Sequence, residues 1–149
     1  MHSSRSRVCV YCGSRSGAQP VYKAAARALG RALANHGIGL IYGGGAAGLM
    51  GALADAALAA NGEVIGVIPR ALFKRDLAHN GLSELIVVDD MPQRKAQMAA
   101  PAQAIIGLPG GLGTLEEMSE ALSWAQLDLH DKPICLLNVD GYFDALISF

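Results

Sequence analysis

The sequence is poor in charged and in aromatic side chains. Charged residues make up 17% of its 149 residues, well below the roughly 25% typical of soluble domains, and aromatic residues only 5%. The low aromatic content argues against an aromatic-rich β-sandwich, and the 52% of hydrophobic residues excludes an intrinsically disordered chain. The formal net charge of −1 gives no bulk attraction to nucleic acid or to an anionic membrane. We therefore expect a compact protein with neither partner.

The sequence also has no long, uninterrupted hydrophobic run. The polar start Met1–Arg7 is followed by an apolar run of only Val8–Tyr11, which is too short for a secretory signal. The stretch Gly37–Gly62 is long enough to span a bilayer. However, it contains Gly43-Gly44-Gly45 and Asp55, and it is rich in alanine instead of leucine. A buried strand, turn and helix is the favoured interpretation.

The cysteines form neither a disulfide framework nor a recognisable zinc site. Three cysteines cannot pair fully, and there is no second C-x-x-C or histidine cluster to complete a zinc site. Cys9 and Cys12 lie three positions apart on a predicted strand, so they should face opposite sides of the sheet. We expect inert thiols in a cytoplasmic protein, with no bound metal.

Short apolar runs alternate with longer helical stretches, the pattern of a parallel sheet wound with helices. Strands are predicted at Val8–Cys12, Gly39–Tyr42, Val64–Ile68, Leu85–Val88, Ala104–Leu108 and Ile134–Leu137. Helices are predicted from Pro20 to Gly37, from Leu49 to Ala60, after Pro92, and from Leu115 to Leu129. Without a repeat or a linker, residues 1–149 should form one doubly wound α/β domain with helices on both faces.

The first glycine loop, Gly43–Gly48, matches G-x-G-x-x-G, and Glu63 follows about 20 residues later. As a dinucleotide fingerprint it is misplaced, because it follows the second strand and not the first. Its exposed backbone, at Gly44 and Gly45, and the start of the next helix could still bind a phosphate. Tight packing of helix on strand is an equally good explanation.

The second loop, Pro109–Glu117, is more specific. Its glycines leave backbone amides uncovered for an anion: Gly110, Gly111 and Gly113. The pattern Thr114-x-x-Glu117 is also a capping box, in which Glu117 would only bond the backbone of the cap. Against that interpretation, two adjacent carboxylates, Glu116 and Glu117, stand at one helix start. The helix dipole should keep them ionised, which suits them to stabilising a cation.

Two cations show the opposite arrangement. Arg94 and Lys95 fall in the first turn of the helix after Pro92, where cations oppose the helix dipole. A surface helix tolerates this at small cost. The functional interpretation is that both side chains serve an anionic ligand above the carboxyl edge of the sheet.

Four runs together resemble the LONELY GUY family, whose members activate cytokinins and have long been mislabelled as lysine decarboxylases. These are Tyr42-Gly-Gly-Gly, Gly66-Val-Ile-Pro69, Met91-x-x-Arg94-Lys95 and Pro109-Gly-Gly-x-Gly-Thr-x-Glu-Glu117. The similarity extends over nearly the whole chain. It implies a Rossmann-like fold, no nicotinamide or other cofactor, and a homodimer with the active site near the interface.

The family's catalytic pair falls on Arg94 and Glu117 in this sequence. Its substrate contacts fall on Asp76, Lys95, Gly111, Gly113, Thr114, Glu116 and Ser123. The chain departs from the family pattern at two positions. It has Pro92 where family members often have histidine, and it reads Ala102-Gln103-Ala104 where they commonly read Ala-Asp-Ala. Asp76 is shorter than the usual glutamate. Family members also continue for some tens of residues past Phe149, so the resemblance implies a sequence shortened at its C-terminus.

The resemblance implies hydrolysis of the N-glycosidic bond of adenine-type nucleoside 5′-monophosphates, releasing the free base and ribose 5-phosphate. Positive charge develops on the ribose, and Glu117 would stabilise it while Glu116 binds the ribose hydroxyls. Arg94 would help the base to leave or fix the nucleotide, while Lys95 and the glycine amides would hold the phosphate.

Two rival functions remain: a non-catalytic carrier of a nucleotide or of molybdenum cofactor on the same fold, and a nicotinamide oxidoreductase. The joint presence of Arg94 and Glu117 favours the hydrolase over the carrier, and the misplaced fingerprint disfavours the oxidoreductase. A decarboxylase would need a lysine for pyridoxal phosphate, and no motif marks one.

The last predicted helix bears on assembly. Its inward stripe is expected to consist of Leu115, Met118 and Leu122, which leaves Trp124 and Leu127 outside it. This is more apolar surface than one core-facing side needs. With so few charges overall, we expect that surface to form a two-fold dimer.

Overall fold

The computed structural model describes residues 5–149, so part of the polar start Met1–Arg7 lies outside the described residues. Its centre is a six-stranded sheet, parallel throughout, with the strand order β4-β3-β2-β1-β5-β6. The strands are β1 Arg7–Tyr11, β2 Gly39–Tyr42, β3 Val64–Pro69, β4 Glu84–Val88, β5 Ala104–Gly107 and β6 Ile134–Leu136. All six predicted strands are present, each within one residue of its expected ends.

The helices follow the expected alternation. They are α1 Pro20–Asn35, α2 Gly48–Ala59, α3 Arg70–Phe73, α4 Met91–Ala99, α5 Leu112–Gln126 and α6 Asp144–Ser148, with a 3₁₀ turn at Val139–Gly141. As predicted, α1 begins at Pro20 and ends before Gly37, which has a φ of +68°. The four-residue α3 carries too weak a pattern to be found from the sequence. Within residues 5–149, no helix combines the length and the apolar character needed to cross a bilayer.

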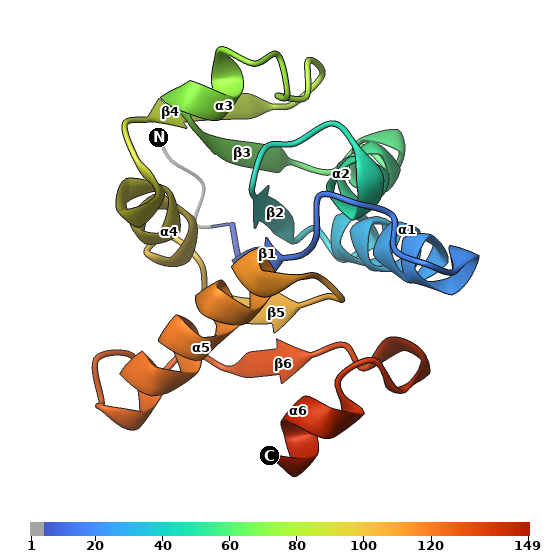
Figure 1. Ribbon diagram of the computed structural model, residues 1–149. Helices are drawn as coiled ribbons and strands as arrows, with labels where there is room; N and C mark the ends of the chain where they lie inside the picture. Colours follow the sequence, from blue (N-terminus) through green and yellow to red (C-terminus); the bar gives the residue numbers. More distant parts are fainter. Residues whose placement is uncertain (1–4) are drawn as a thin grey trace.

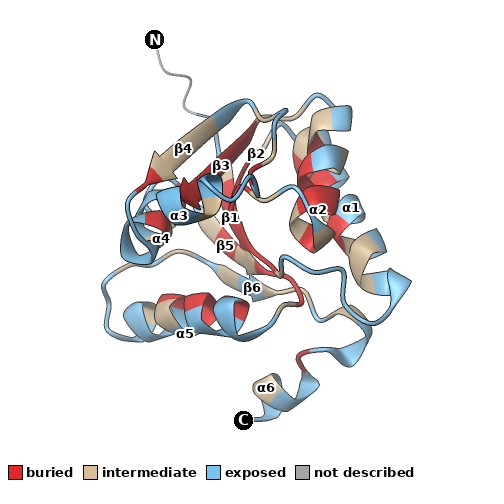
Figure 2. Cartoon of the chain, turned by 45° about the horizontal axis from the view of Figure 1, so that its top comes forward, coloured by how far each residue is buried: buried red, intermediate tan, exposed pale blue. Residues whose placement is uncertain are grey.

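Helices cover both faces of the sheet (Figure 1). The pair α1 and α2 packs on one face and α4 with α5 on the other, and each face has its own apolar core. Cys12 belongs to the first core and Cys9 to the second, which confirms that the two thiols face opposite ways. Burial raises the pKa of each thiol to about 12, so both stay protonated and unreactive. The buried residues concentrate in the central strands and on the inner sides of α1 and α2 (Figure 2).

The direction of winding reverses between β1 and β5. Strands β2 to β4 continue from one side of β1, whereas β5 and β6 continue from the other. The loops that leave β1 and β5 therefore part at the carboxyl edge of the sheet, where such folds bind ligands. The predicted fold class, a Rossmann-like doubly wound parallel sheet, is confirmed.

The start and the orientation of α5 differ from the prediction. The helix begins at Leu112 with Gly111 as its N-cap, and no side chain caps it, so Thr114 and Glu117 do not form the capping box that was the alternative to a functional Glu117. Its buried residues are Thr114, Glu117, Met118 and Ala121, whereas Leu115 and Leu122 are 42% and 46% exposed.

The physical reason for this orientation lies at the sheet. A Cβ at Gly107 of β5 would lie 2.8 Å from Met118 Sδ, so Met118 packs directly against the strand. Thr114 lies one turn before Met118 on the same side of the helix, and Glu117, directly before Met118, borders that side. Packing of Met118 therefore turns these two polar residues inward and leaves the leucines outside.

Candidate active site

A pocket of 990 Å³ opens at the carboxyl edge of the sheet. Three loops line it: the β1–α1 loop with Cys12–Arg15, the β2–α2 loop with Gly43 and Gly45–Ala47, and the β5–α5 loop from Pro109. Gly13 N–H donates to Pro109 O at 3.2 Å, which ties the first and third of these loops together. The pocket thus lies at the point where the winding of the sheet reverses.

Arg94 enters this pocket from α4. Asp90 caps that helix by accepting from Gln93 N–H at 2.9 Å, which places Arg94 in its first turn, as predicted. The side chain is only 7% exposed. Its Nε donates to Val67 O at 2.9 Å and its guanidinium also bonds to Gly43 O. Burial lowers the pKa of Arg94, but an arginine pKa is high enough that the side chain stays charged. A fixed positive charge therefore lies at the carboxyl ends of β2 and β3.

Glu117 enters the pocket from α5 and is 8% exposed. Burial raises its pKa to about 7, although the nearby charge of Arg94 acts in the opposite direction. The expectation that the helix dipole would keep this carboxylate fully ionised is therefore wrong. Glu117 lies in the second turn of α5 and away from water, so desolvation exceeds the effect of the dipole. Near neutral pH it exists in both protonation states.

The glycines of the β5–α5 loop leave open space at the start of α5. A Cβ at Gly110 would lie 2.0 Å from Thr114 Oγ1, so this position cannot carry a side chain without moving the loop. A Cβ at Gly111 or at Gly113 would meet nothing within 4 Å. Both glycines line the pocket, as does Thr114. The uncapped amides of this helix start are thus accessible to a ligand that enters the pocket.

Lys95, predicted as a phosphate contact, has carboxylate partners in the structure. Its Nζ bonds to Glu116 Oε1 at 2.5 Å and to Glu120 Oε2 at 2.7 Å. These two bonds connect α4 to α5, and Lys95 itself does not line the pocket. Glu116 does line it, although its carboxylate is already paired with Lys95.

Two other predicted contacts lie outside the pocket. Ser123 is exposed on α5, and Asp76 is exposed in the loop after α3, with a φ of +58°. The neighbours of Asp76, Arg75 and Leu77, line the pocket instead. The structure therefore brings the loop of Asp76 to the site but not the aspartate itself.

The first glycine loop contributes only part of its predicted phosphate site. Gly45 lines the pocket and its carbonyl accepts from Tyr42 Oη at 2.8 Å. Gly44 lies beneath the loop with a φ of +80°, and a Cβ there would lie 3.3 Å from Cβ of Ile68. The role of Gly44 is therefore tight packing of the loop on β3.

Glu63 does not occupy the position that a dinucleotide site requires. It directly precedes β3, at the amino edge of the sheet, and accepts from Arg7 Nε at 2.8 Å. The hydrogen bond from Arg7 lowers the pKa of this carboxyl. Glu63 thus forms an ion pair at the edge opposite the pocket.

Sequence reasoning missed several residues that line the pocket. Arg15 follows β1, Tyr22 belongs to α1, and Tyr142 follows the 3₁₀ turn. The rings of Tyr22 and Tyr142 meet edge to face with centroids 5.5 Å apart, and Tyr142 Oη donates to Gly110 O. The position of Arg15 just after β1 was a usable signal, because loops that follow strands form the ligand edge. No sequence pattern pairs Tyr22 with a residue 120 positions away.

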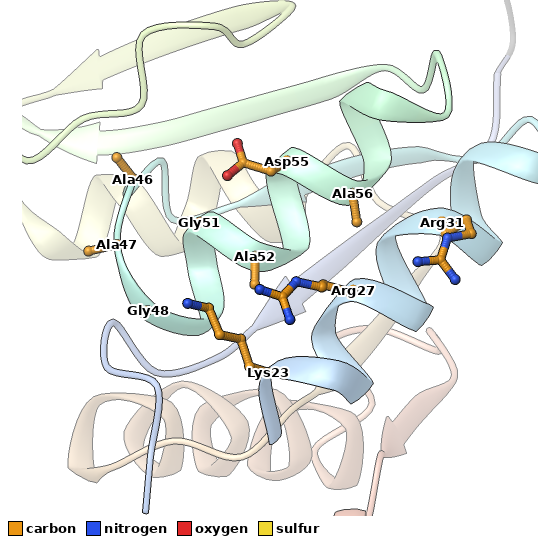
Figure 3. A pocket seen from close by; sticks show the side chains of 10 residues that line it. All are labelled: Lys23, Arg27, Arg31, Ala46, Ala47, Gly48, Gly51, Ala52, Asp55 and Ala56. Atoms are coloured by element: carbon orange, nitrogen blue, oxygen red, sulfur yellow. The ribbon is translucent and has the colours of Figure 1, made fainter. Parts of the chain in front are cut away.

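A second hollow, of 460 Å³, lies between α1 and α2 (Figure 3). Lys23, Arg27 and Arg31 border it from α1, and small residues of α2 form its floor. Ala46 and Ala47 line both this hollow and the larger pocket. Lys23 is partly exposed and both arginines are exposed, as expected for a solvated basic face. Across residues 5–149, no group of three or more His, Cys, Asp or Glu side chains is placed to hold a metal ion.

Comparison with known proteins gives a consistent result. The profile of a family described as "Possible lysine decarboxylase" matches residues 50–149. A probable cytokinin riboside 5′-monophosphate phosphoribohydrolase of Oryza sativa subsp. japonica is 51% identical over 96% of this chain. A cytokinin riboside 5′-monophosphate phosphoribohydrolase of Arabidopsis thaliana is 49% identical over 100% of it. The chain belongs to the LONELY GUY family.

The match to these LONELY GUY relatives does not extend over their full length. The chain spans 59% of the Oryza sativa protein and 70% of the Arabidopsis thaliana protein.

Among solved structures, the molybdenum cofactor binding protein of Rippkaea orientalis has a TM-score of 0.79 and 26% identity, covering 99% of this chain and 85% of that protein. The molybdenum cofactor carrier protein of Chlamydomonas reinhardtii has a TM-score of 0.75 and 23% identity, covering 97% and 83%, and shows a shared fold only.

Proposed function

We propose that this chain hydrolyses the N-glycosidic bond of adenine-type nucleoside 5′-monophosphates and releases the free base and ribose 5-phosphate. The observation that carries this proposal is the meeting of Arg94 and Glu117 in one pocket with the uncapped start of α5. These groups come from two different helices.

The start of α5 is the proposed site for the 5′-phosphate. Its amides carry partial positive charge and point out of a helix of 15 residues, and the neighbouring glycines leave room for an anion. Arg15 and Arg75 also border the pocket and add positive charge. Because Lys95 is bonded to two carboxylates, we assign it to connecting α4 with α5 and not to the phosphate.

Glu117 is the proposed catalytic carboxylate. Cleavage of the glycosidic bond develops positive charge on the ribose, and a buried anion stabilises that charge strongly because water does not screen it. In its ionised form Glu117 would also orient the attacking water. Arg94 would hold the nucleotide and favour departure of the base, and Glu116 at the pocket rim would bind ribose hydroxyls. The base itself would lie against apolar side chains of the same pocket, such as Met50 and Leu72.

Two other functions make different predictions for the same pocket. A carrier, as the structural neighbours are named, would bind its ligand without turnover. A decarboxylase using pyridoxal phosphate needs a lysine, yet within residues 5–149 no lysine lines the larger pocket.

The deciding experiment measures release of free base from AMP and from isopentenyladenosine monophosphate, each compared with its unphosphorylated nucleoside. The hydrolase requires turnover of the nucleotides. Binding of nucleotide without base release supports the carrier instead.

We further propose a homodimer in the cytoplasm, with neither nucleic acid nor membrane as a partner. Support for the dimer comes from the exposed apolar side of α5, where Trp124 and Leu127 are 48% and 65% exposed. Support for the location comes from the three free thiols at Cys9, Cys12 and Cys135.

A further inference from the structure

One wall of the pocket is a short segment between α3 and β4. Arg75 and Leu77 of this segment line the pocket, while α3 before it has only four residues. A helix of one turn has little stability of its own, because nucleation costs more than so few hydrogen bonds return. Asp76 in between adopts a φ of +58°, which non-glycine residues rarely do. Contacts with the rest of the molecule must therefore hold this wall in place.

The backbone of this segment forms hydrogen bonds with the backbone of the first glycine loop. Ala46 N–H donates to Leu77 O at 3.2 Å and His79 N–H donates to Gly44 O at 2.9 Å, around an antiparallel bridge between Gly45 and Ala78. Two hydrogen bonds of this kind are too few to fix a strand pair. A further anchor is needed, and the side chain of His79 supplies it.

The imidazole of His79 lies between α2 and its own loop. Its Nδ1 accepts from Gly81 N–H at 2.9 Å, so Nδ1 carries no proton and the proton of the neutral ring is on Nε2. That Nε2–H donates to Asp55 Oδ1 at 2.6 Å; the His79 side chain is 13% exposed, whereas that of Asp55 is 68% exposed. Figure 3 shows the Asp55 carboxylate turned away from Arg27 on α1. Asp55 thus serves the histidine and not the basic face.

The helix that carries Asp55 is held rigidly. A Cβ at Gly30 of α1 would lie 2.3 Å from Leu53 O of α2, so the two backbones are in close contact. Gly48 is both the last residue of the first glycine loop and the first residue of α2, and it has a φ of +60°. The hydrogen bond from His79 therefore connects the pocket wall to the closely packed pair of helices α1 and α2.

We propose that Asp55 and His79 act as positioning residues that hold the Arg75–Ala78 wall against the substrate. The inference rests on the proposed nucleotide hydrolase, whose substrate this wall would contact. Neither side chain reaches Arg94 or Glu117, which come from α4 and α5. Loss of the contact therefore weakens nucleotide binding while the catalytic groups stay in place.

The test uses substitutions that remove one bond at a time. His79→Gln keeps a donor near the position of Nε2, whereas His79→Asn keeps only an acceptor for Gly81 N–H. Asp55→Asn keeps an acceptor for Nε2–H, and Asp55→Ala removes it. The matched control is His36→Ala, since His36 is exposed at the end of α1 and bonds only to Ala32 O.

The expected result is a rise in KM for AMP of about three- to five-fold in Asp55→Ala and in His79→Asn, as befits loss of one hydrogen bond at a largely exposed carboxylate, with kcat within about two-fold of the wild type. Asp55→Asn, His79→Gln and His36→Ala should keep the wild-type KM. The double variant Asp55→Ala/His79→Asn should be no worse than either single variant, because both remove the same contact. Additive losses, or kcat falling with KM unchanged, overturn the proposal.

A second measurement separates this inference from the proposed function. Hydrogen exchange of the amides of residues 75–79, without any substrate, should be faster in Asp55→Ala and His79→Asn than in Asp55→Asn. AMP binding by calorimetry should weaken in the same two variants. If the wild type releases no base, the hydrolase proposal fails, yet these two measurements still decide the role of His79. Unchanged exchange and unchanged binding overturn it.

Discussion

Glu117 and Arg94 lie in one pocket, and burial shifts their pKa values in opposite directions. Removal from water favours the neutral form of both, which raises the pKa of Glu117 to about 7 and lowers that of Arg94. Arginine stays charged regardless, because its pKa is so high, and it bonds to two backbone carbonyls. The helix dipole contributes only about 0.3–1 kcal/mol near a helix end. The protonation state of Glu117 is therefore set by its depth in the pocket.

Replacing Glu117 with glutamine tests its catalytic role. Glu117→Gln keeps the size of the side chain but removes the charge, so base release from AMP should fall by at least about 100-fold, on the scale of one preorganised electrostatic contact. AMP binding by calorimetry should persist, which shows that the pocket is intact. Full activity in this variant would remove Glu117 from the mechanism.

The same substitution should also change stability in a pH-dependent way. Below the ordinary pKa of 4.5 the carboxyl is protonated in both the folded and the unfolded chain. Between 4.5 and about 7 the unfolded chain loses this proton first, so the wild type loses stability relative to Glu117→Gln as the pH rises. Urea unfolding should show the variant more stable by about 2–3 kcal/mol at pH 8 but by less than about 1 kcal/mol at pH 5. An equal difference at both pH values would contradict the buried, raised-pKa carboxyl.

At the scale of elements, the start of α5 organises the site. One end of this helix presents uncapped amides and the glycines of the β5–α5 loop, and Tyr142 holds that loop through Gly110 O. Further along, Lys95 connects α5 to α4 through Glu116 and Glu120. The helix is thus fixed at both its start and its middle.

This arrangement predicts a strong preference for the 5′-phosphate. Charge-assisted hydrogen bonds are worth about 1.5–3 kcal/mol each, so two of them should make kcat/KM for AMP at least about 100-fold higher than for adenosine. Gly110→Ala should abolish most of this preference, because its Cβ would displace Thr114 and the loop. Equal turnover of AMP and adenosine would remove phosphate recognition from the mechanism.

At the scale of the whole molecule, α5 leaves apolar side chains exposed on both flanks of its buried side. Leu115 and Leu122, expected inside, lie on one flank, whereas Trp124 lies on the other and Leu127 just past the end of the helix. Trp124 and Leu127, the residues that first suggested a dimer, are exposed as expected. Single exposed apolar residues are ordinary, but several of them gathered on one element are typical of an interface.

A dimer would have a mass of about 31 kDa, twice the 15.5 kDa of one chain. Trp124→Glu should shift light scattering at micromolar concentration toward 15.5 kDa and should lower activity, since α5 also carries Glu117. Val21→Glu, on the exposed side of α1, is the control and should leave the mass unchanged. A fully active wild-type monomer would contradict the dimer.

The sequence by itself determined the strand positions, the alternation of layers and the glycine loops at the ligand edge. These follow from local properties: hydrophobic runs, helix-starting prolines and glycines that follow strands. It also singled out Arg94, because a cation in a first helical turn opposes the helix dipole, and Glu117, because two adjacent carboxylates stand beside a glycine loop.

Only the tertiary structure decided the chemical state of those residues. The orientation of α5 depends on Met118 packing against Gly107, and this contact buries Glu117 and exposes Leu115. The partners of Lys95 and the contact between His79 and Asp55 join residues 21 to 25 positions apart in the chain. Burial and charge pairing are properties of neighbours in space, and the order of residues along the chain does not specify which neighbours meet until the helices pack.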